Sequence, residues 1–168
     1  MATVLLLLDE QKNAPLPPDP LPGAAAVTAA IDGLVRRARS AGALVVHVRD
    51  AGAGAPGVPG REPATEAADG EHVVDRTGPD AFAGTGLAAL LPVGAEVVVA
   101  GTRSEIGVRA TALTALDRGH RVVLARGAHA THAPGVPREV EAELRAAGAL
   151  VVDPQSVEFG PAGDGSRR

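Results

Sequence analysis

The stretch AEVVVAGTRSEIGVRATALTALDRG, residues 95–119, decides the fold of this 168-residue chain. It opens with a continuous apolar run, which predicts a strand over residues 96–100 that is covered on both faces. The run after it predicts a helix over residues 105–118. A buried strand followed by a helix is typical of α/β proteins with a parallel sheet.

The rest of the chain repeats this alternation on both sides of the central stretch. Further strands are expected over residues 4–8, 44–48, 72–74, 121–125 and 149–152. Further helices are expected over residues 24–41, within 82–91 and over 136–147. Residues 13–23 and 51–70 are rich in Pro, Gly and Ala and predict loops. The whole pattern predicts an open parallel α/β sheet.

Length and composition narrow the class of protein. We expect one domain over residues 1–160, followed by a flexible tail over 161–168. The net charge of −4 argues against a nucleic-acid partner, because proteins that bind nucleic acids normally present a basic face. No segment approaches the roughly 20 apolar residues of a membrane span, and the first apolar run is too short for a signal peptide. The chain has no cysteine, which fits a cytoplasmic protein.

Three residues mark a candidate crevice. In open α/β sheets, ligands bind at the C-terminal ends of the strands, near the point where the strand order reverses. Asp9 ends the first expected strand, Arg76 follows the third, and Gly107 lies in the first turn of the helix after the fourth. We therefore expect these residues to meet at one edge of the sheet.

Three motifs then suggest a family. The segment GTRSEIGVRATA, residues 101–112, resembles the signature G-x-x-T-x-x-C-V-x-x-T-A of the isochorismatase-like hydrolase superfamily. LLLLDEQ at 5–11 resembles the family's first strand, which ends in D-x-Q, and RTGPDAFAGTGL at 76–87 resembles K-x-x-x-S-A-F-x-G-T-x-L. The resemblance implies a three-layer, mostly parallel six-stranded sheet with helices on both faces. It also implies a small-molecule substrate and a homodimer or higher homo-oligomer.

The resemblance implies which residues carry the chemistry. In the cysteine hydrolases of the superfamily the catalytic residues are Asp, Lys and Cys, and here these positions hold Asp9, Arg76 and Gly107. Glycine in place of the nucleophile excludes a covalent thioester. True isochorismatases resemble this chain in having glycine there, and they hydrolyse a vinyl ether by proton transfer from the Asp.

On this basis we predict Asp9 and Arg76 as catalytic residues. Backbone N–H groups at the helix N-terminus near Gly107 are expected to stabilise negative charge. The predicted substrate-binding residues are Gln11, Phe82, Thr102, Arg103, Ser104, Glu105 and Gly107.

Each of these residues also has a structural interpretation. Asp9 taken alone could simply cap a loop at a strand end. Arg76 could hold Asp9, clamp an anionic substrate, or lie exposed on a loop. A close Arg76 would lower the pKa of Asp9 unless desolvation opposes it. Glu105 could be a second acid/base group, although a carboxylate that stabilises the helix dipole is the preferred interpretation.

No metal and no cofactor are expected. The segment after the second strand, residues 47–52, has no D-x-H pattern of the kind that binds a metal in nicotinamidase-type members of the superfamily. His129 and His132 are expected in a loop after the fifth strand, where such a pair is seldom a ligand set. The match to G-x-G-x-x-G at residues 52–57 follows the second expected strand, whereas a nucleotide-binding motif follows the first. Nucleotide binding is therefore a much weaker hypothesis than the two that follow.

Two hypotheses for function remain. The first is a cysteine-less enzyme that acts on a small anionic metabolite by hydrolysis, elimination or rearrangement, in a biosynthetic pathway of secondary metabolism. The second is an inactive pseudoenzyme with a binding or structural role. A buried Asp9 with a perturbed pKa would favour the enzyme, and a crevice filled by side chains would favour the pseudoenzyme. Retention of Asp9 and Gln11 favours the enzyme.

Overall fold

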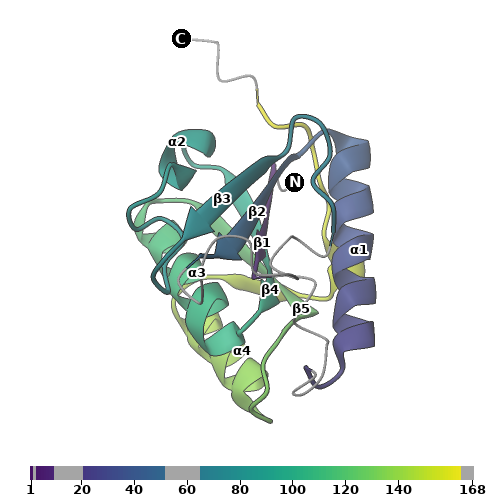
Figure 1. Ribbon diagram of the computed structural model, residues 1–168, viewed down its shortest axis with the longest axis vertical. Helices are drawn as coiled ribbons and strands as arrows, with labels where there is room; N and C mark the ends of the chain where they lie inside the picture. The colour runs from purple at the N-terminus through teal and green to yellow at the C-terminus, as the bar shows by residue number, and fades with distance from the viewer. Residues whose placement is uncertain (2, 10–20, 52–64, 164–168) are drawn as a thin grey trace.

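The computed structural model describes residues 1, 3–9, 21–51 and 65–163 of the chain (Figure 1). In this part of the chain, six strands form one sheet in the order β3-β2-β1-β4-β5-β6, and all neighbouring strands are parallel. The strands are β1 (Val4–Leu8), β2 (Leu44–Asp50), β3 (His72–Arg76), β4 (Glu96–Thr102), β5 (Arg121–Ala130) and β6 (Leu150–Val152). The parallel six-stranded sheet expected from the sequence is confirmed.

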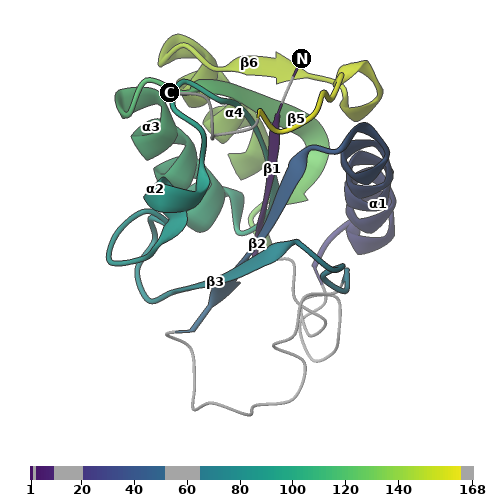
Figure 2. The ribbon, with the colours of Figure 1, turned by 90° about the horizontal axis from the view of Figure 1, so that it is seen from above.

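Helices cover both faces of this sheet, as Figures 1 and 2 show. One face carries α1, and the other carries α2, α3 and α4. The helices are α1 (Ala24–Ala41), α2 (Leu87–Leu90), the π-helix η1 (Ser104–Val108), α3 (Arg109–Asp117), α4 (Val136–Ala146) and the 3₁₀ helix η2 (Pro154–Ser156). The predicted three-layer α/β architecture is therefore present.

The central strand β1 divides the core into two halves. Successive side chains of a strand point to opposite faces, so β1 serves both apolar layers. Leu5 and Leu7 pack into the layer beneath α1, whereas Leu6 and Leu8 pack into the layer beneath α3 and α4. All five side chains of β1 are buried, as the continuous apolar run predicts.

The strand β5 is longer than the sequence predicts. Its pairing with β4 shifts register between Val99 and Gly101, where Val99 pairs with Leu124 but Gly101 pairs with His129. The strand then continues to Ala130, beyond the bulge. The expectation that His129 lies in a loop is therefore wrong: it is a buried residue of the strand.

The sheet places the candidate site where the direction of chain connection reverses. That point lies between β1 and β4, the two strands that begin the two halves of the sheet. Gly101 lets these strands meet, because a Cβ atom there would lie 2.0 Å from the carbonyl oxygen of Leu8. Its φ of +141° also favours glycine. Asp9 and Thr102 stand directly at this junction.

Candidate functional site

Asp9 is held by the backbones of both neighbouring strands. Its N–H donates to the carbonyl oxygen of Val48 at 2.9 Å, and its own carbonyl accepts a hydrogen bond from the Thr102 hydroxyl at 2.6 Å. Asp9 has a φ of +54°, the left-handed conformation that L-residues adopt at a cost. Such strained residues are concentrated at functional sites, where the surroundings hold them in place.

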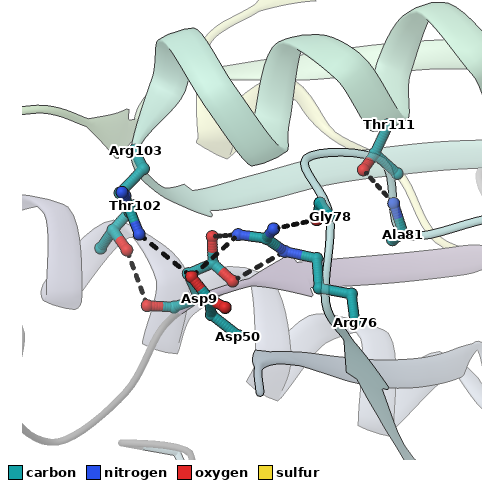
Figure 3. Close-up of polar contacts among 8 residues, drawn as sticks. All are labelled: Asp9, Asp50, Arg76, Gly78, Ala81, Thr102, Arg103 and Thr111. Atoms are coloured by element: carbon teal, nitrogen blue, oxygen red, sulfur yellow. Dashed lines mark hydrogen bonds and ion pairs between the residues drawn. The ribbon is translucent and has the colours of Figure 1, made fainter. Parts of the chain in front are cut away.

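Arg76 is the direct partner of the Asp9 carboxylate (Figure 3). The guanidinium of Arg76 donates from Nε to Oδ1 at 3.1 Å and from Nη2 to Oδ2, in a two-pronged pair. Nη1 donates to the carbonyl oxygen of Gly78. Both charged side chains are only 3% exposed. Arg76 is therefore the last residue of β3 and a buried clamp on Asp9, and an exposed loop position is excluded.

A second ion pair extends this network toward solvent. Asp50, the last residue of β2, lies 3.7 Å from Nη2 of Arg76 and accepts a hydrogen bond from Nη1 of Arg103 at 3.0 Å. Positive and negative groups thus alternate from Asp9 outward, and their formal charges cancel. The Arg103 side chain is 46% exposed and Arg76 only 3%, so Arg103 is the solvent-accessible cation of this network.

Burial dominates the pKa of Asp9. Loss of hydration raises the pKa of this carboxyl group, and the nearby charge of Asp50 acts in the same direction. The hydrogen bonds and charge of Arg76, with a contribution from Arg103, oppose the rise. The net effect is a pKa raised above the ordinary value of an aspartate. The sequence analysis named two opposing influences on the pKa of Asp9, a close Arg76 and desolvation, and desolvation is the larger.

Gly107 completes the site from the other side. A Cβ atom at this position would lie 2.9 Å from Oδ2 of Asp9 and 3.3 Å from Nη2 of Arg76. The predicted meeting of these three residues is therefore what the structure shows. The Asp9–Arg76 pair occupies the space into which a side chain at position 107 would project, so any larger residue here would require the pair to shift.

The other predicted binding residues have different environments. Thr102 supports the Asp9 backbone and Arg103 lies at the rim, as described above. Glu105 is exposed in the first turn of η1, where a carboxylate stabilises the positive end of the helix. Gln11 lies outside the described residues.

Phe82 and Ser104 are buried away from solvent. Phe82 is 4% exposed in the core layer beneath α3, with its ring 6.4 Å from that of His120 and 5.0 Å from the guanidinium of Arg118. Phe82 is thus part of the core. Ser104 is fully buried, and its Oγ lies 2.9 Å from Nδ1 of His129.

Asp50 is the site residue that sequence reasoning missed. It ends a buried strand, as Asp9 does, and the same strand-end argument would have found it. Its neighbour along the chain, Arg49, pairs instead with Asp75 on the exposed side of β2 and β3. Which of two adjacent polar residues faces the site depends on strand register.

Metal binding and membrane insertion have no support in the described residues. Over residues 1, 3–9, 21–51 and 65–163, no group of three or more His, Asp or Glu side chains could hold a metal ion. None of the helices in these ranges is both long and apolar enough to cross a membrane.

Comparison with known proteins identifies the family. The model of the isochorismatase domain matches residues 3–156. The chain belongs to the isochorismatase family of hydrolases. A solved isochorismatase family protein from Desulfovibrio vulgaris is 31% identical, with a TM-score of 0.82 over 93% of this chain and 96% of that one.

Two curated relatives in the isochorismatase family carry a more specific name. Both are called streptothricin hydrolase, from Streptomyces noursei, and they are 45% and 42% identical to this chain over 152 residues. Each match covers 83% of this chain. The chain spans 55% and 60% of the length of these relatives.

Proposed function

We propose that this isochorismatase-family protein hydrolyses a small metabolite with Asp9 as its acid/base group. The observation that carries the proposal is the buried Asp9 carboxyl, which has a raised pKa and lies at the junction of β1 and β4. Carboxyl groups tuned in this way are common at active sites, because a raised pKa makes proton donation possible nearer neutral pH. Arg76 orients Asp9 and limits its rotation.

The chemistry follows from what the site contains. Asp9 in its protonated form donates a proton to the substrate, and the resulting carboxylate draws a proton from the attacking water. Gly107 has no nucleophilic side chain and the chain has no cysteine, so the reaction passes through no thioester. Backbone N–H groups of η1, next to the carboxylate, stabilise charge that develops on the substrate.

The substrate is proposed to carry an anionic group that binds Arg103. This side chain is the exposed cation of the network, and its carboxylate partner within the described ranges is Asp50. The names of the relatives make streptothricin a second test compound. Hydrolysis of streptothricin without any anionic substrate would refute the Arg103 part of the proposal and leave Asp9 chemistry standing.

The test compares wild type with Asp9→Asn. Streptothricin and a panel of cyclic carboxylic acids, including isochorismate, are incubated with each protein, and products are followed by mass spectrometry. We expect wild type to turn over one compound and Asp9→Asn to lose about 10²- to 10⁴-fold in rate. Asp75→Asn, which changes a carboxylate that is half exposed on β3, is the matched control and should retain the rate. Equal rates for wild type and Asp9→Asn would refute the acid/base role.

The second candidate is a pseudoenzyme that binds a small molecule without converting it. One observation favours it: Asp9 and Arg76 fill the space beside Gly107. Thermal shift distinguishes the two, because any ligand of the folded state raises the melting temperature. A compound that stabilises wild type but yields no product would support the pseudoenzyme.

Several expectations from the sequence stay predictions. They are the single domain over residues 1–160, the absence of a cofactor, the homo-oligomer, the cytoplasmic location and the role in a biosynthetic pathway. The flexible tail falls mainly on residues 164–168, outside the described ranges.

A further inference from the structure

A chain of three polar side chains lies behind the site. Ser104 of η1, His129 of β5 and Glu141 of α4 connect three elements that are distant in sequence. Ser104 Oγ is 2.9 Å from His129 Nδ1, and His129 Nε2 is 3.3 Å from Glu141 Oε1. The Ser104 residue and the His129 side chain are fully buried. Buried polar groups of this kind are costly unless they are paired, so their arrangement constrains the elements that carry them.

The neighbours of His129 define its protonation. Nε2 of His129 faces the Glu141 carboxylate but makes no hydrogen bond within the described part of the chain. The negative charge of Glu141 favours a proton on Nε2, which leaves Nδ1 to accept from the Ser104 hydroxyl. Burial lowers the pKa of His129, and the charge of Glu141 opposes this effect. Glu141 itself lies near Arg126 of β5, whose Nε is 3.6 Å from Glu141 Oε2. The side that faces η1 presents the uncharged Ser104.

The same helix η1 carries both Ser104 and Gly107. Ser104 is its first residue, and a Cβ atom on Gly107 would lie 2.9 Å from Oδ2 of Asp9 and 3.3 Å from Nη2 of Arg76. The π-helix η1 runs directly into α3, and single π-turns within helices are frequent at functional sites. A shift of Ser104 relative to His129 therefore changes how closely Gly107 covers Asp9.

We propose that His129 is a positioning residue: by accepting the Ser104 hydrogen bond, it fixes η1 at the position where Gly107 closes over Asp9 and Arg76. Its effect on rate rests on the proposed function, whereas its effect on the environment of Asp9 does not. Loss of the hydrogen bond loosens η1 and admits water to the Asp9 carboxyl. Because burial is what raises the pKa of Asp9, that pKa then falls toward its ordinary value.

The test uses Ser104→Ala and His129→Asn in the full chain. Ser104→Ala removes the donor. In His129→Asn, the amide oxygen replaces Nδ1 as acceptor, while the group that faces Glu141 is lost. NMR titration of the Asp9 carboxyl carbon should show a fall of about 0.5 pH unit or more in Ser104→Ala and a smaller change in His129→Asn. On a substrate identified by the turnover assay of the proposed function, kcat should fall about tenfold or more in Ser104→Ala, with KM little changed.

Two controls separate positioning from general structural damage. Thr114→Ala removes another partly buried hydroxyl, which donates to Asp80 at 3.0 Å, and should leave the Asp9 titration unchanged. Glu141→Gln removes the charge that raises the pKa of His129, so the titration of the His129 ring should move to lower pH. An unchanged His129 titration in Glu141→Gln would overturn the assigned arrangement.

The outcomes for the positioning role and for the proposed function are distinguishable. An Asp9 titration in Ser104→Ala that matches wild type would overturn the positioning role, whatever the rates show. A shifted Asp9 titration in a protein that hydrolyses none of the compounds would support the positioning role and refute the enzyme. If Ser104→Ala does not fold, His129→Phe, which removes the acceptor, takes its place, and an Asp9 titration that matches wild type would overturn the positioning role.

Discussion

Two carboxylate–arginine pairs in this molecule have opposite electrostatic outcomes. Asp9 pairs with Arg76 at the candidate site, and its pKa is raised. Glu71, just before β3, pairs with Arg39 in the last turn of α1, and its pKa is lowered to about 2. Both carboxylate side chains are largely buried, at 3% and 7% exposure. The identity of the paired residues therefore does not decide the sign of the shift.

The difference lies in the balance of desolvation and donors. Burial raises the pKa of Glu71, but hydrogen bonds from Arg39, the Ala68 N–H and His47 together outweigh it. At Asp9 burial outweighs Arg76, and the carboxylate of Asp50 adds to the rise. Glu71 is thus a fully hydrogen-bonded link between α1 and the start of β3, whereas Asp9 takes up a proton more readily than an ordinary aspartate. This contrast can be tested by removing one partner at a time.

The largest effect is expected from Arg76→Met. It leaves the Asp9 carboxylate buried without its partner, and we expect a loss of about 3–5 kcal/mol in unfolding free energy at pH 7. Urea unfolding measures it. Arg39→Met is the matched control and should lose less, about 1–2 kcal/mol, because Glu71 keeps the Ala68 N–H and His47. Equal losses in the two variants would contradict the distinction between the pairs.

The next largest loss of unfolding free energy is expected from Gly107→Ala. Its Cβ would approach Asp9 and Arg76 within 2.9 and 3.3 Å, so the pair must shift, and we expect a loss of about 1–3 kcal/mol by thermal or urea unfolding. Gly33→Ala in α1 is the control, because its nearest neighbour is the mobile end of Arg37 at 3.5 Å. There alanine should stabilise by about 0.4–1 kcal/mol. Stabilisation by both variants would show that position 107 has room for a side chain.

The pH dependence of stability should differ in sign between the pairs. The folded-state pKa of Glu71 lies below its ordinary value of 4.5, so its stabilisation is present above pH 4.5 and is lost as the pH falls toward 2. Glu71→Gln should therefore cost on the order of 2 kcal/mol at pH 7, and the difference from wild type should vanish in acid.

For Asp9 the sign is reversed. Its folded-state pKa lies above the ordinary value of 3.8, so the native state binds the proton more tightly, and stability falls as the pH rises through the raised pKa. Urea unfolding at several pH values should show wild type losing stability relative to Asp9→Asn as the pH rises above 3.8. Parallel pH profiles for these two proteins would contradict the raised pKa.

The smallest effect is expected at an exposed pair. Asp75 accepts hydrogen bonds from Arg49 at 2.7 and 2.8 Å, but the two side chains are 50% and 34% exposed. Asp75→Asn should change the unfolding free energy by about 0–1 kcal/mol, and added salt should shrink the difference. A loss comparable with that of Arg76→Met would show that burial is not what separates these pairs.

Local patterns predicted most of the secondary structure. The apolar run over residues 4–8 and the spacing of Val27, Ile31 and Leu34 placed β1 and the buried face of α1 correctly. The C-terminal half of β5 was missed, because the segment around His129 has no apolar run and its strand conformation depends on pairing with β4 across a bulge. The same non-local pairing brought His129 to Ser104, which no spacing in the sequence indicates.

The sequence by itself determined the alternation that builds the parallel sheet, the strand-end position of Asp9 and the absence of any thiolate nucleophile. These properties follow from residue identity and local periodicity. Only the tertiary structure decided that the guanidinium of Arg76 binds Asp9 beside Gly107, and that the pKa of Asp9 rises while that of Glu71 falls. A pKa shift is the difference between lost hydration and gained partners, and the packing of distant segments sets both quantities.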